Sequence, residues 1–408
     1  MFRFFHCLPT LFCVFALASQ IFFSPDAAAQ LWSRTNGPTE RSVYALTTRN
    51  DTIYAGTAAG IYSSVDSGSS WRLLAFGKQT ISAFGEDFSG KFYACPHSAG
   101  VHSSEDNGET WQPMNNGLPD GATVYALAQR NFVMLAGADT GGVYRTSDGG
   151  LNWKQTKLNS GWVYALISKP NTGDVYAGTF GGRAYYSYNS GEDWQRVDST
   201  LIMQTEGRPV RTLLYFGDYV YAGVAGSGVY RTNDTGKTWQ MMNNGIGVPD
   251  IRALAEHNGV LYAGSQYGGV YMSRDSGMTW KQTVAGMDVL KTRAFAFVGA
   301  RPFAATDGGG VYICDLSIPM GVEEWNNAEI AVYPNPAPEK IYIDIQLNAP
   351  VLCRLSLYSA LGERVYANAE FADGHFSASI DMLQFPAGTY YIEISDGLRR
   401  TVRGFVKN

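Results

Sequence analysis

The sequence predicts an all-β protein in which a sevenfold repeat is followed by a smaller β domain. Three observations support this prediction: an apolar motif occurs seven times, a tryptophan recurs every 40 to 45 residues, and no repeat has a helical apolar period. Of the 408 residues, 46 are glycine and 13% are aromatic, as expected for many short strands joined by tight turns. A chain of this length has room for two or three domains.

Each repeat begins with a short apolar motif, which we interpret as the first of four strands. The motif starts in turn at Val43, Ile81, Val124, Val163, Val210, Ile251 and Thr292. A second apolar run, such as Tyr54-Ala55-Gly56, follows about ten residues later, and a third run comes after it. Four strands in a period of about 40–45 residues are typical of one blade of a β-propeller.

Six repeats also carry the pattern Ser/Thr-x-Asp-x-Gly-x-x-Trp. Its aspartate fits a hairpin turn whose carboxylate accepts backbone N–H groups, its glycine supplies a positive φ, and its tryptophan is expected to cover the hairpin base. The six pairs are Asp66 and Trp71, Asp106 and Trp111, Asp148 and Trp153, Asn189 and Trp194, Asp234 and Trp239, and Asp275 and Trp280. Asparagine can make the same turn, so the fourth repeat should fold like the others. The pattern resembles the Asp-box, or BNR repeat, of sialidase-like propellers.

The seventh repeat lacks the pattern and has only three strands. The missing strand is found at the other end of the chain, where Leu31–Gly37 resembles the segment 239–245 that follows another signature. We therefore expect residues 31–36 to pair with the strand around Val311–Asp315, because such pairing removes the open sheet edges of a linear array. The predicted fold is a seven-bladed β-propeller over residues 30–316, closed by its N-terminal strand.

Residues 1–29 are interpreted as a secretory signal peptide rather than as part of the fold. A basic start with Arg3 precedes an apolar run over 8–23, and a small-residue site ends at Ala29. An N-terminal membrane anchor is the alternative. Cys7 and Cys13 would leave with the signal, and the three remaining cysteines make no disulfide framework. The net charge of −5 argues against a nucleic-acid partner.

Residues 317–330 are polar and read as a linker, and residues 331–408 as a small β-sandwich. This last segment resembles the C-terminal sorting domain of the type IX (Por) secretion system, through Val332-Tyr333-Pro334-Asn335-Pro336, Leu357-Tyr358-Ser359-Ala360-Leu361-Gly362 and Phe385-Pro386-Ala387-Gly388-Thr389-Tyr390-Tyr391. The resemblance implies export across the outer membrane by the type IX machinery, removal of the domain by its sorting peptidase, and attachment to the cell surface or release. An adhesive or spacer domain is the alternative.

The second residue of each innermost strand forms a ring in the repeat. Its members are Tyr44, Ser82, Tyr125, Tyr164, Arg211, Arg252 and Arg293. The three tyrosines and three arginines, together with Arg208 from the long connection 197–209, are predicted to bind an anionic partner at the mouth of the central channel. No carboxylate recurs at a fixed offset from the arginines, so we expect them to be exposed. Photosystem-assembly-factor-like propellers, which the chain also resembles, carry an arginine patch on such a face; only Arg211, Arg252 and Arg293 match it.

No catalytic residue, metal site or cofactor is predicted. Cys95, His97 and His102 are too dispersed to indicate a metal. Since Asp-box propellers include sialidases and xyloglucan-degrading hydrolases, a secreted glycoside hydrolase is the alternative function, although no pair of carboxylates can be identified. The sequence leaves the question of enzymatic activity open. It favours a monomeric, secreted or cell-surface propeller that binds a protein segment or glycan without catalysis.

Overall fold

The computed structural model describes residues 31–315 and 330–408, except 40, 131, 160, 171, 347–350, 360–363, 373–374 and 396–399. The expected signal peptide at 1–29 lies outside the described residues, and so does the expected linker at 317–330 apart from Ile330. Among the described residues, no helix is long and apolar enough to cross a membrane.

Seven four-stranded antiparallel sheets follow one another along the chain, as the repeat predicts. Blades 1 to 3 contain β2 (Val43–Arg49), β3 (Thr52–Thr57), β4 (Gly60–Ser64) and β5 (Arg72–Ala75); β6 (Ile81–Glu86), β7 (Phe92–Pro96), β8 (His102–Ser104) and β9 (Gln112–Pro113); and β10 (Val124–Arg130), β11 (Val133–Ala138), β12 (Val143–Thr146) and β13 (Lys154–Gln155). Blades 4 and 5 contain β14 (Val163–Ser168), β15 (Val175–Thr179), β16 (Ala184–Ser187) and β17 (Gln195–Arg196); and β18 (Val210–Phe216), β19 (Tyr219–Val224), β20 (Gly228–Thr232) and β21 (Gln240–Met241). Blades 6 and 7 contain β22 (Ile251–His257), β23 (Val260–Ser265), β24 (Gly269–Ser273) and β25 (Lys281–Gln282); and β26 (Thr292–Val298), β27 (Arg301–Thr306), β28 (Gly310–Cys314) and β1 (Trp32–Arg34).

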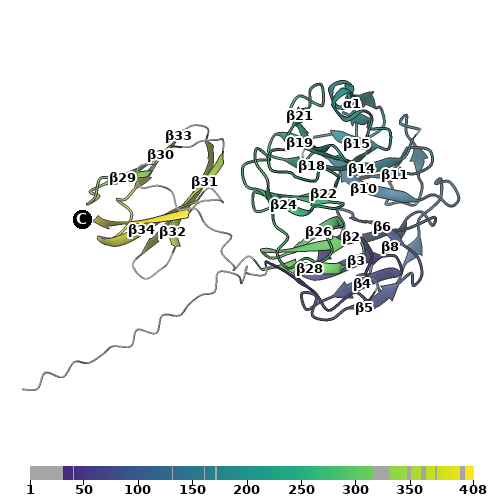
Figure 1. Ribbon diagram of the computed structural model, residues 1–408, viewed down its shortest axis with the longest axis horizontal. Helices are drawn as coiled ribbons and strands as arrows, with labels where there is room; N and C mark the ends of the chain where they lie inside the picture. Colours follow the sequence, from purple (N-terminus) through teal and green to yellow (C-terminus); the bar gives the residue numbers. More distant parts are fainter. Residues whose placement is uncertain are drawn as a thin grey trace, which may run out of the picture.

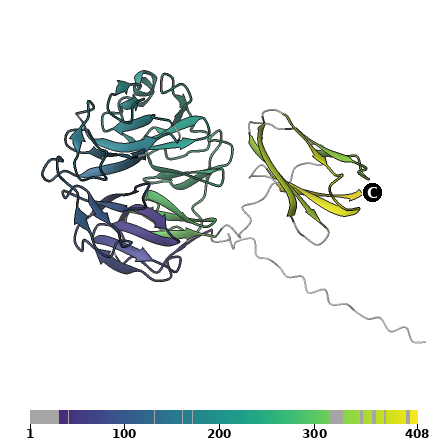
Figure 2. The same cartoon turned by 180° about the vertical axis from the view of Figure 1, so that it is seen from behind.

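The blades are arranged in a closed ring. The first strand of each blade contacts the first strands of both neighbouring blades, and β26 of the seventh blade contacts β2 of the first. Figure 1 shows the green seventh blade beside the purple first blade, and Figure 2 shows the same ring from behind. Apolar clusters fill the space between adjacent blades, so each sheet is covered on both faces.

The N-terminal strand closes the ring, which confirms the prediction from the incomplete seventh repeat. β1 pairs with β28 in antiparallel register, with Trp32 opposite Cys314 and Arg34 opposite Tyr312. The side chain of Trp32 is completely buried. Outside the sheet, the Arg34 guanidinium donates to both carboxylate oxygens of Asp288 at 2.7 Å. This ion pair ties the closing strand to the connection between the last two blades.

The Asp-box turns are built from side-chain hydrogen bonds. In the first blade, Asp66 Oδ1 accepts from the Ser64 hydroxyl at 2.8 Å and from the Ser70 N–H at 2.9 Å. The six box glycines have φ between +81° and +92°, where a side chain would be strained. Asn189 makes the equivalent bonds in the fourth blade. Burial of the box tryptophans joins blades as well as turns, because Trp153 Nε1 donates to the Met114 carbonyl of the preceding blade.

One element departs from the prediction that the repeats contain no helix. The connection between the fourth and fifth blades contains α1 (Ser199–Thr205), a seven-residue helix on the rim of the ring in Figure 1. Glu206 ends it in the left-handed conformation, with φ of 54°. The helix buries Leu201 in the core beside blade 5. Seven residues are too few to produce a clear helical apolar period in the sequence.

The C-terminal domain is the small β-sandwich expected from its alternating strands. One sheet contains β29 (Ile330–Tyr333), β30 (Lys340–Gln346) and β33 (His375–Asp381). The other contains β31 (Val351–Ser359), β32 (Arg364–Ala372), β34 (Gly388–Ser395) and β35 (Arg400–Lys407). A single apolar core contains Ile341 and Ile343 from the first sheet and Leu355 and Ile392 from the second.

The buried position of Trp32 leads to a prediction about ring closure. Replacing Trp32 with alanine should lower the free energy of unfolding by about 3–5 kcal/mol, because a large cavity opens where the two chain ends meet. Deletion of residues 31–37 should destabilise the ring further, since blade 7 then has an open edge. Urea unfolding measures both effects.

The control is Trp162→Ala. Because the Trp162 side chain is 47% exposed, its removal should lower the free energy of unfolding by about 1 kcal/mol or less. Equal losses in Trp32→Ala and the control would contradict the closure argument.

The box carboxylates predict a loss of stability in acid. Hydrogen bonds from the side chain and backbone of Ser70 and from Ser64 lower the pKa of Asp66 to about 2. A carboxyl whose pKa is lowered by folding stabilises the protein at pH above its unfolded pKa, and this contribution disappears as the pH falls through the folded pKa. The difference in unfolding free energy between wild type and Asp66→Asn should therefore be largest above pH 5 and should shrink between pH 4 and about 2. Urea unfolding at several pH values tests this, and a constant difference would show that the Asp66 charge is not involved.

Candidate functional site

A β-bulge at the start of every inner strand creates the candidate site. In all seven blades the pairing of the first two strands shifts register around the second residue, for example between Val43 and Ala45. A bulge leaves its extra residue outside the ladder and redirects the side chain. The seven bulge residues are the predicted ring, and each is half-buried: Tyr44, Ser82, Tyr125, Tyr164, Arg211, Arg252 and Arg293. We call these seven residues the inner ring.

Members of the inner ring touch one another across blade boundaries. The rings of Tyr125 and Tyr164 lie 5.1 Å apart, and the Arg211 guanidinium carbon lies 4.1 Å from the centre of the Tyr164 ring. On the other side of the channel, the Arg293 guanidinium carbon is 5.9 Å from the ring centre of Tyr44. Burial raises the pKa of Tyr125, and the positive charge of Arg211 opposes that effect. The charge of Arg211 is thus felt across the blade boundary at Tyr125.

The three ring arginines, which we expected to be exposed, are half-buried, and two of them pair with a carboxylate. The Nε atom of Arg252 is 2.9 Å from Asp250 Oδ1, and Arg293 donates to Asp307 at 2.8 Å. Burial would raise the pKa of Asp307, but the hydrogen bond and positive charge of Arg293 give a net lowering, so this carboxylate is ionised at neutral pH. The two aspartates occupy different repeat positions, one before the inner strand and one after the second strand.

Arg211 differs from the other two ring arginines. Within the described part of the chain, no carboxylate forms an ion pair with it, whereas Arg252 and Arg293 each have one. Arg208, three residues earlier, is exposed and likewise has no ion pair to a described residue. Its guanidinium lies against Gly226, in the loop that joins β19 to β20. Blade 5 therefore carries two arginines whose charges are not balanced by a neighbouring described carboxylate.

Two aromatic residues next to the inner ring were not predicted. Trp162 comes just before β14 and Phe180 just after β15, and the Phe180 N–H donates to the Trp162 carbonyl at 3.0 Å. Their rings are 5.6 Å apart, and each lies 6.3 Å from the Tyr164 ring. Comparing the positions that flank the inner strands would have found them. At the position of Trp162 the other repeats have Ser42, Thr80, Thr123, Pro209, Asp250 and Lys291.

The residues weighed for other chemistry do not form a site. The Cys95 thiol is buried with a raised pKa, and burial lowers the pKa of His102, whose ring contacts Phe76. No group of three His, Cys, Asp or Glu side chains in the described residues could hold a metal ion. Asp139 accepts the Thr123 N–H at 3.1 Å.

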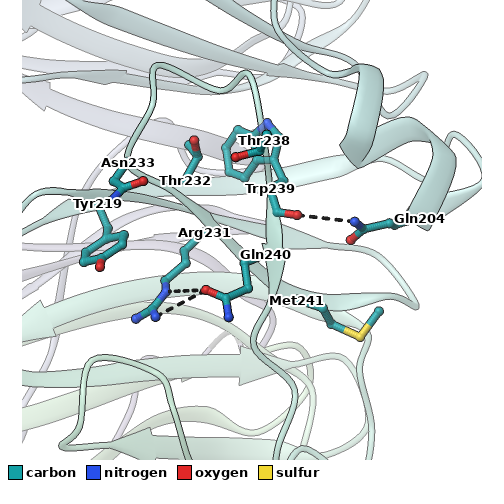
Figure 3. A pocket seen from close by; sticks show the side chains of 9 residues that line it. All are labelled: Gln204, Tyr219, Arg231, Thr232, Asn233, Thr238, Trp239, Gln240 and Met241. Carbon is teal, nitrogen blue, oxygen red and sulfur yellow. Dashed lines mark hydrogen bonds between the residues drawn. The ribbon is translucent and has the colours of Figure 1, made fainter. Parts of the chain in front are cut away.

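A groove of about 550 Å³ lies on the rim of the propeller, apart from the inner ring. Figure 3 shows Arg231 and Gln240 pointing toward each other on its floor, and Gln204 of α1 reaching the Trp239 carbonyl. The Arg231 guanidinium is also stacked 4.4 Å from the Tyr219 ring centre and donates to the Ser276 carbonyl. Since these polar groups already have partners within the protein, the groove offers a ligand fewer free polar contacts than the inner ring does.

Two family models match the chain. Residues 24–292 match the model described as Photosynthesis system II assembly factor YCF48, and residues 331–408 match the model described as Secretion system C-terminal sorting domain. The C-terminal sandwich is thus a sorting domain of an exported protein. No curated protein matches the sequence at a significant level.

Solved structures share the fold at low sequence identity. YCF48 from Cyanidioschyzon merolae is 17% identical with a TM-score of 0.57, over 71% of this chain and 99% of that one. A structure titled YCF48 bound to D1 peptide is also 17% identical, with a TM-score of 0.57, over 70% and 96% of the two chains. PorZ of Porphyromonas gingivalis, described as a surface component of the type IX secretion system, is 13% identical with a TM-score of 0.51, over 91% and 60%.

Proposed function

This chain belongs to the YCF48 family of propellers, and on that premise we propose that it is an exported protein whose inner ring binds an acidic segment of another protein without catalysis. The observation that carries the proposal is the state of Arg211. Its charge is half-buried, it is stacked on Tyr164, and no described carboxylate neutralises it. A guanidinium in this setting gains from a carboxylate brought by a partner, because such hydrogen bonds are strengthened by both charges.

The choice of a protein segment over a glycan is supported by the relatives. One structure of the same family carries a peptide, according to its title. Our proposal transfers only this general class of ligand, and the contacts come from the residues of this chain. Arg211 would bind the acidic group, Arg208 would add long-range attraction from the same blade, and Tyr125 and Tyr164 would line the contact.

The state of the carboxylates near the inner ring supports binding rather than glycoside hydrolysis. A glycosidase needs two carboxyl groups that are available to the substrate. Asp250 and Asp307 are each engaged by an arginine at 2.9 Å and 2.8 Å, and Asp139 accepts a backbone N–H. A carboxylate held by a guanidinium is a weaker base than a free one, because the cation stabilises its charged form.

The proposal also covers how the protein is exported from the cell. We propose that residues 1–29 direct the chain across the inner membrane and that the sorting domain at 331–408 then directs export through the type IX machinery. Removal of that domain within 317–330 by the sorting peptidase would leave a monomeric propeller, either attached to the cell surface or released.

The export proposal predicts the mass of the mature protein. The surface or medium fraction of the native cell should contain a form that starts at about Gln30 and lacks roughly the last 80 residues, the length of the sorting domain. Intact-mass measurement of the purified protein decides this. A surface form that still ends at Asn408 would contradict removal of the domain.

The binding proposal predicts a specific loss in Arg211→Ala. The variant should lose no more than about 2 kcal/mol of stability, because the cation–π contact with Tyr164 is removed but no described ion pair is. It should bind acidic peptides about tenfold more weakly, and the difference should be greater at low salt, where screening is weakest. Arrays of acidic peptides and of carboxylated glycans identify the probe, and calorimetry gives the affinity.

The matched control is Arg72→Ala, an exposed arginine of the outer strand β5 that pairs with Glu109 in the Asp-box turn of blade 2. It changes the net charge equally and should leave peptide binding unchanged. The proposed function is wrong if Arg211→Ala binds as wild type, or if only glycans bind and the wild type hydrolyses them.

A further inference from the structure

We infer that four aromatic side chains beside Arg211 recognise a second feature of the ligand: a bulky apolar ring directly next to the acidic residue. These side chains are Tyr125, Trp162, Tyr164 and Phe180, which we call the aromatic platform. The inference rests on the proposed function and makes it more specific. It names a ligand class, a protein segment in which Phe, Tyr, Trp or Pro neighbours Asp or Glu.

The aromatic platform is a continuous group of rings from two adjacent blades. Tyr125 is the bulge residue of blade 3, and the other three residues belong to blade 4. Besides the contacts given above, the Tyr125 and Trp162 rings lie 6.4 Å apart. All of these centroid distances are within the range in which aromatic rings attract one another. The backbone hydrogen bond from Phe180 to Trp162 holds these two residues in place. The platform is therefore already assembled without a ligand.

Large apolar side chains on the platform are open to solvent. Trp162 is 47% exposed and Phe180 is 54% exposed, although both lie beside half-buried members of the inner ring. Apolar surface left exposed as a group, rather than as single scattered residues, marks a binding surface. Tryptophan and tyrosine are also the residues that contribute most where protein segments bind, since they bury a large area at a low cost in side-chain entropy.

The platform and Arg211 are close enough to be reached by neighbouring residues of one ligand. Tyr164 contacts both, with its ring centre 4.1 Å from the Arg211 guanidinium carbon and 6.3 Å from the Phe180 ring centre. An extended chain advances about 3.3–3.6 Å per residue. A carboxylate bound at Arg211 therefore leaves the adjacent residue within reach of the platform.

The rest of the inner ring does not compete for such a ligand. Arg252 and Arg293 are neutralised by Asp250 and Asp307, so the unbalanced positive charge lies in blade 5, next to the platform. Charge complementarity thus sets the position of the acidic residue, and the platform takes its apolar neighbour. The full-length propeller supplies all of these groups, and no further subunit is needed.

The test compares peptides that differ only in the position of one ring. All are acetylated and amidated, so that the single carboxylate is an Asp side chain. One contains Phe-Asp, the second Gly-Asp, and the third contains Phe and Asp separated by four glycines. By calorimetry the wild-type protein should bind the Phe-Asp peptide about tenfold more tightly than either of the others.

Substitutions assign the effect to the platform. Trp162→Ala combined with Phe180→Ala should remove the preference for Phe-Asp and keep the weaker, salt-dependent binding shared by all three peptides. Trp162→Phe should keep most of the preference. The control is Phe88→Ala combined with Phe132→Ala, which removes a more exposed aromatic pair, 64% and 70% exposed, from turns at the far ends of the inner strands. That control should keep the wild-type preference.

The results distinguish failure of the platform inference from failure of the proposed function. If all three peptides bind the wild type equally and Arg211→Ala weakens them all, the platform inference is wrong and the proposed function stands. The platform inference is also wrong if the Phe88 and Phe132 control loses the preference as the Trp162 and Phe180 variant does. If no acidic peptide binds while a hexuronic oligosaccharide does, both the inference and the proposed protein ligand are overturned.

Discussion

Pairing of β1 with β28 is the interaction on which the rest of the propeller depends. It is the point where the two ends of a ring of about 285 residues are joined by backbone hydrogen bonds. Trp32 extends this joint into the core, because it packs with Tyr262 and Met272 of blade 6 as well as with Tyr312 of blade 7. Without this strand the seventh sheet would have an open edge. The backbone contacts that remain between the first and last blades include those of Arg41 and Ser42 with residues 307–310.

Ring closure also makes the functional asymmetry possible. The inner strands are held in a fixed circle, so bulge residues on neighbouring blades meet at defined distances, as Tyr125, Tyr164 and Arg211 do. The Asp-box turns lie at the end of each sheet that is opposite to the bulges of the inner ring. In the first blade, Thr57 pairs with Val43 near the bulge, whereas Ser64, where the box begins, pairs with Ile53. Residues that stabilise the turns are therefore separated along the strands from the inner ring.

The architecture could be predicted from the sequence because the motif of one blade occurs seven times, so each occurrence supports the same interpretation. The number of blades, the closing strand and the C-terminal sandwich all follow from repeated motifs. Features that occur once could not be predicted in this way. The helix α1 occupies a single connection and has only seven residues, among them the buried Leu201. Asp250 and Asp307 stand at different offsets from their arginines, so no periodic signal linked them. Trp162 and Phe180 lie at flanking positions that are small or polar in most of the other repeats.

The energetics of Arg211 are the reason that the proposed site lies in one sector of the ring. Taking an arginine side chain out of water costs several kcal/mol unless its charge is compensated. Asp250 and Asp307 compensate Arg252 and Arg293, but Arg211 has only the face of Tyr164, and a cation–π contact contributes about 0.5–2 kcal/mol. Its Nε atom is nevertheless buried without a hydrogen bond. This arrangement is stable only because the guanidinium remains half-buried and keeps access to solvent. A partner carboxylate that replaces that water meets a cation that is already oriented by Tyr164, and so binding at this point costs less side-chain entropy than it would at a free surface arginine.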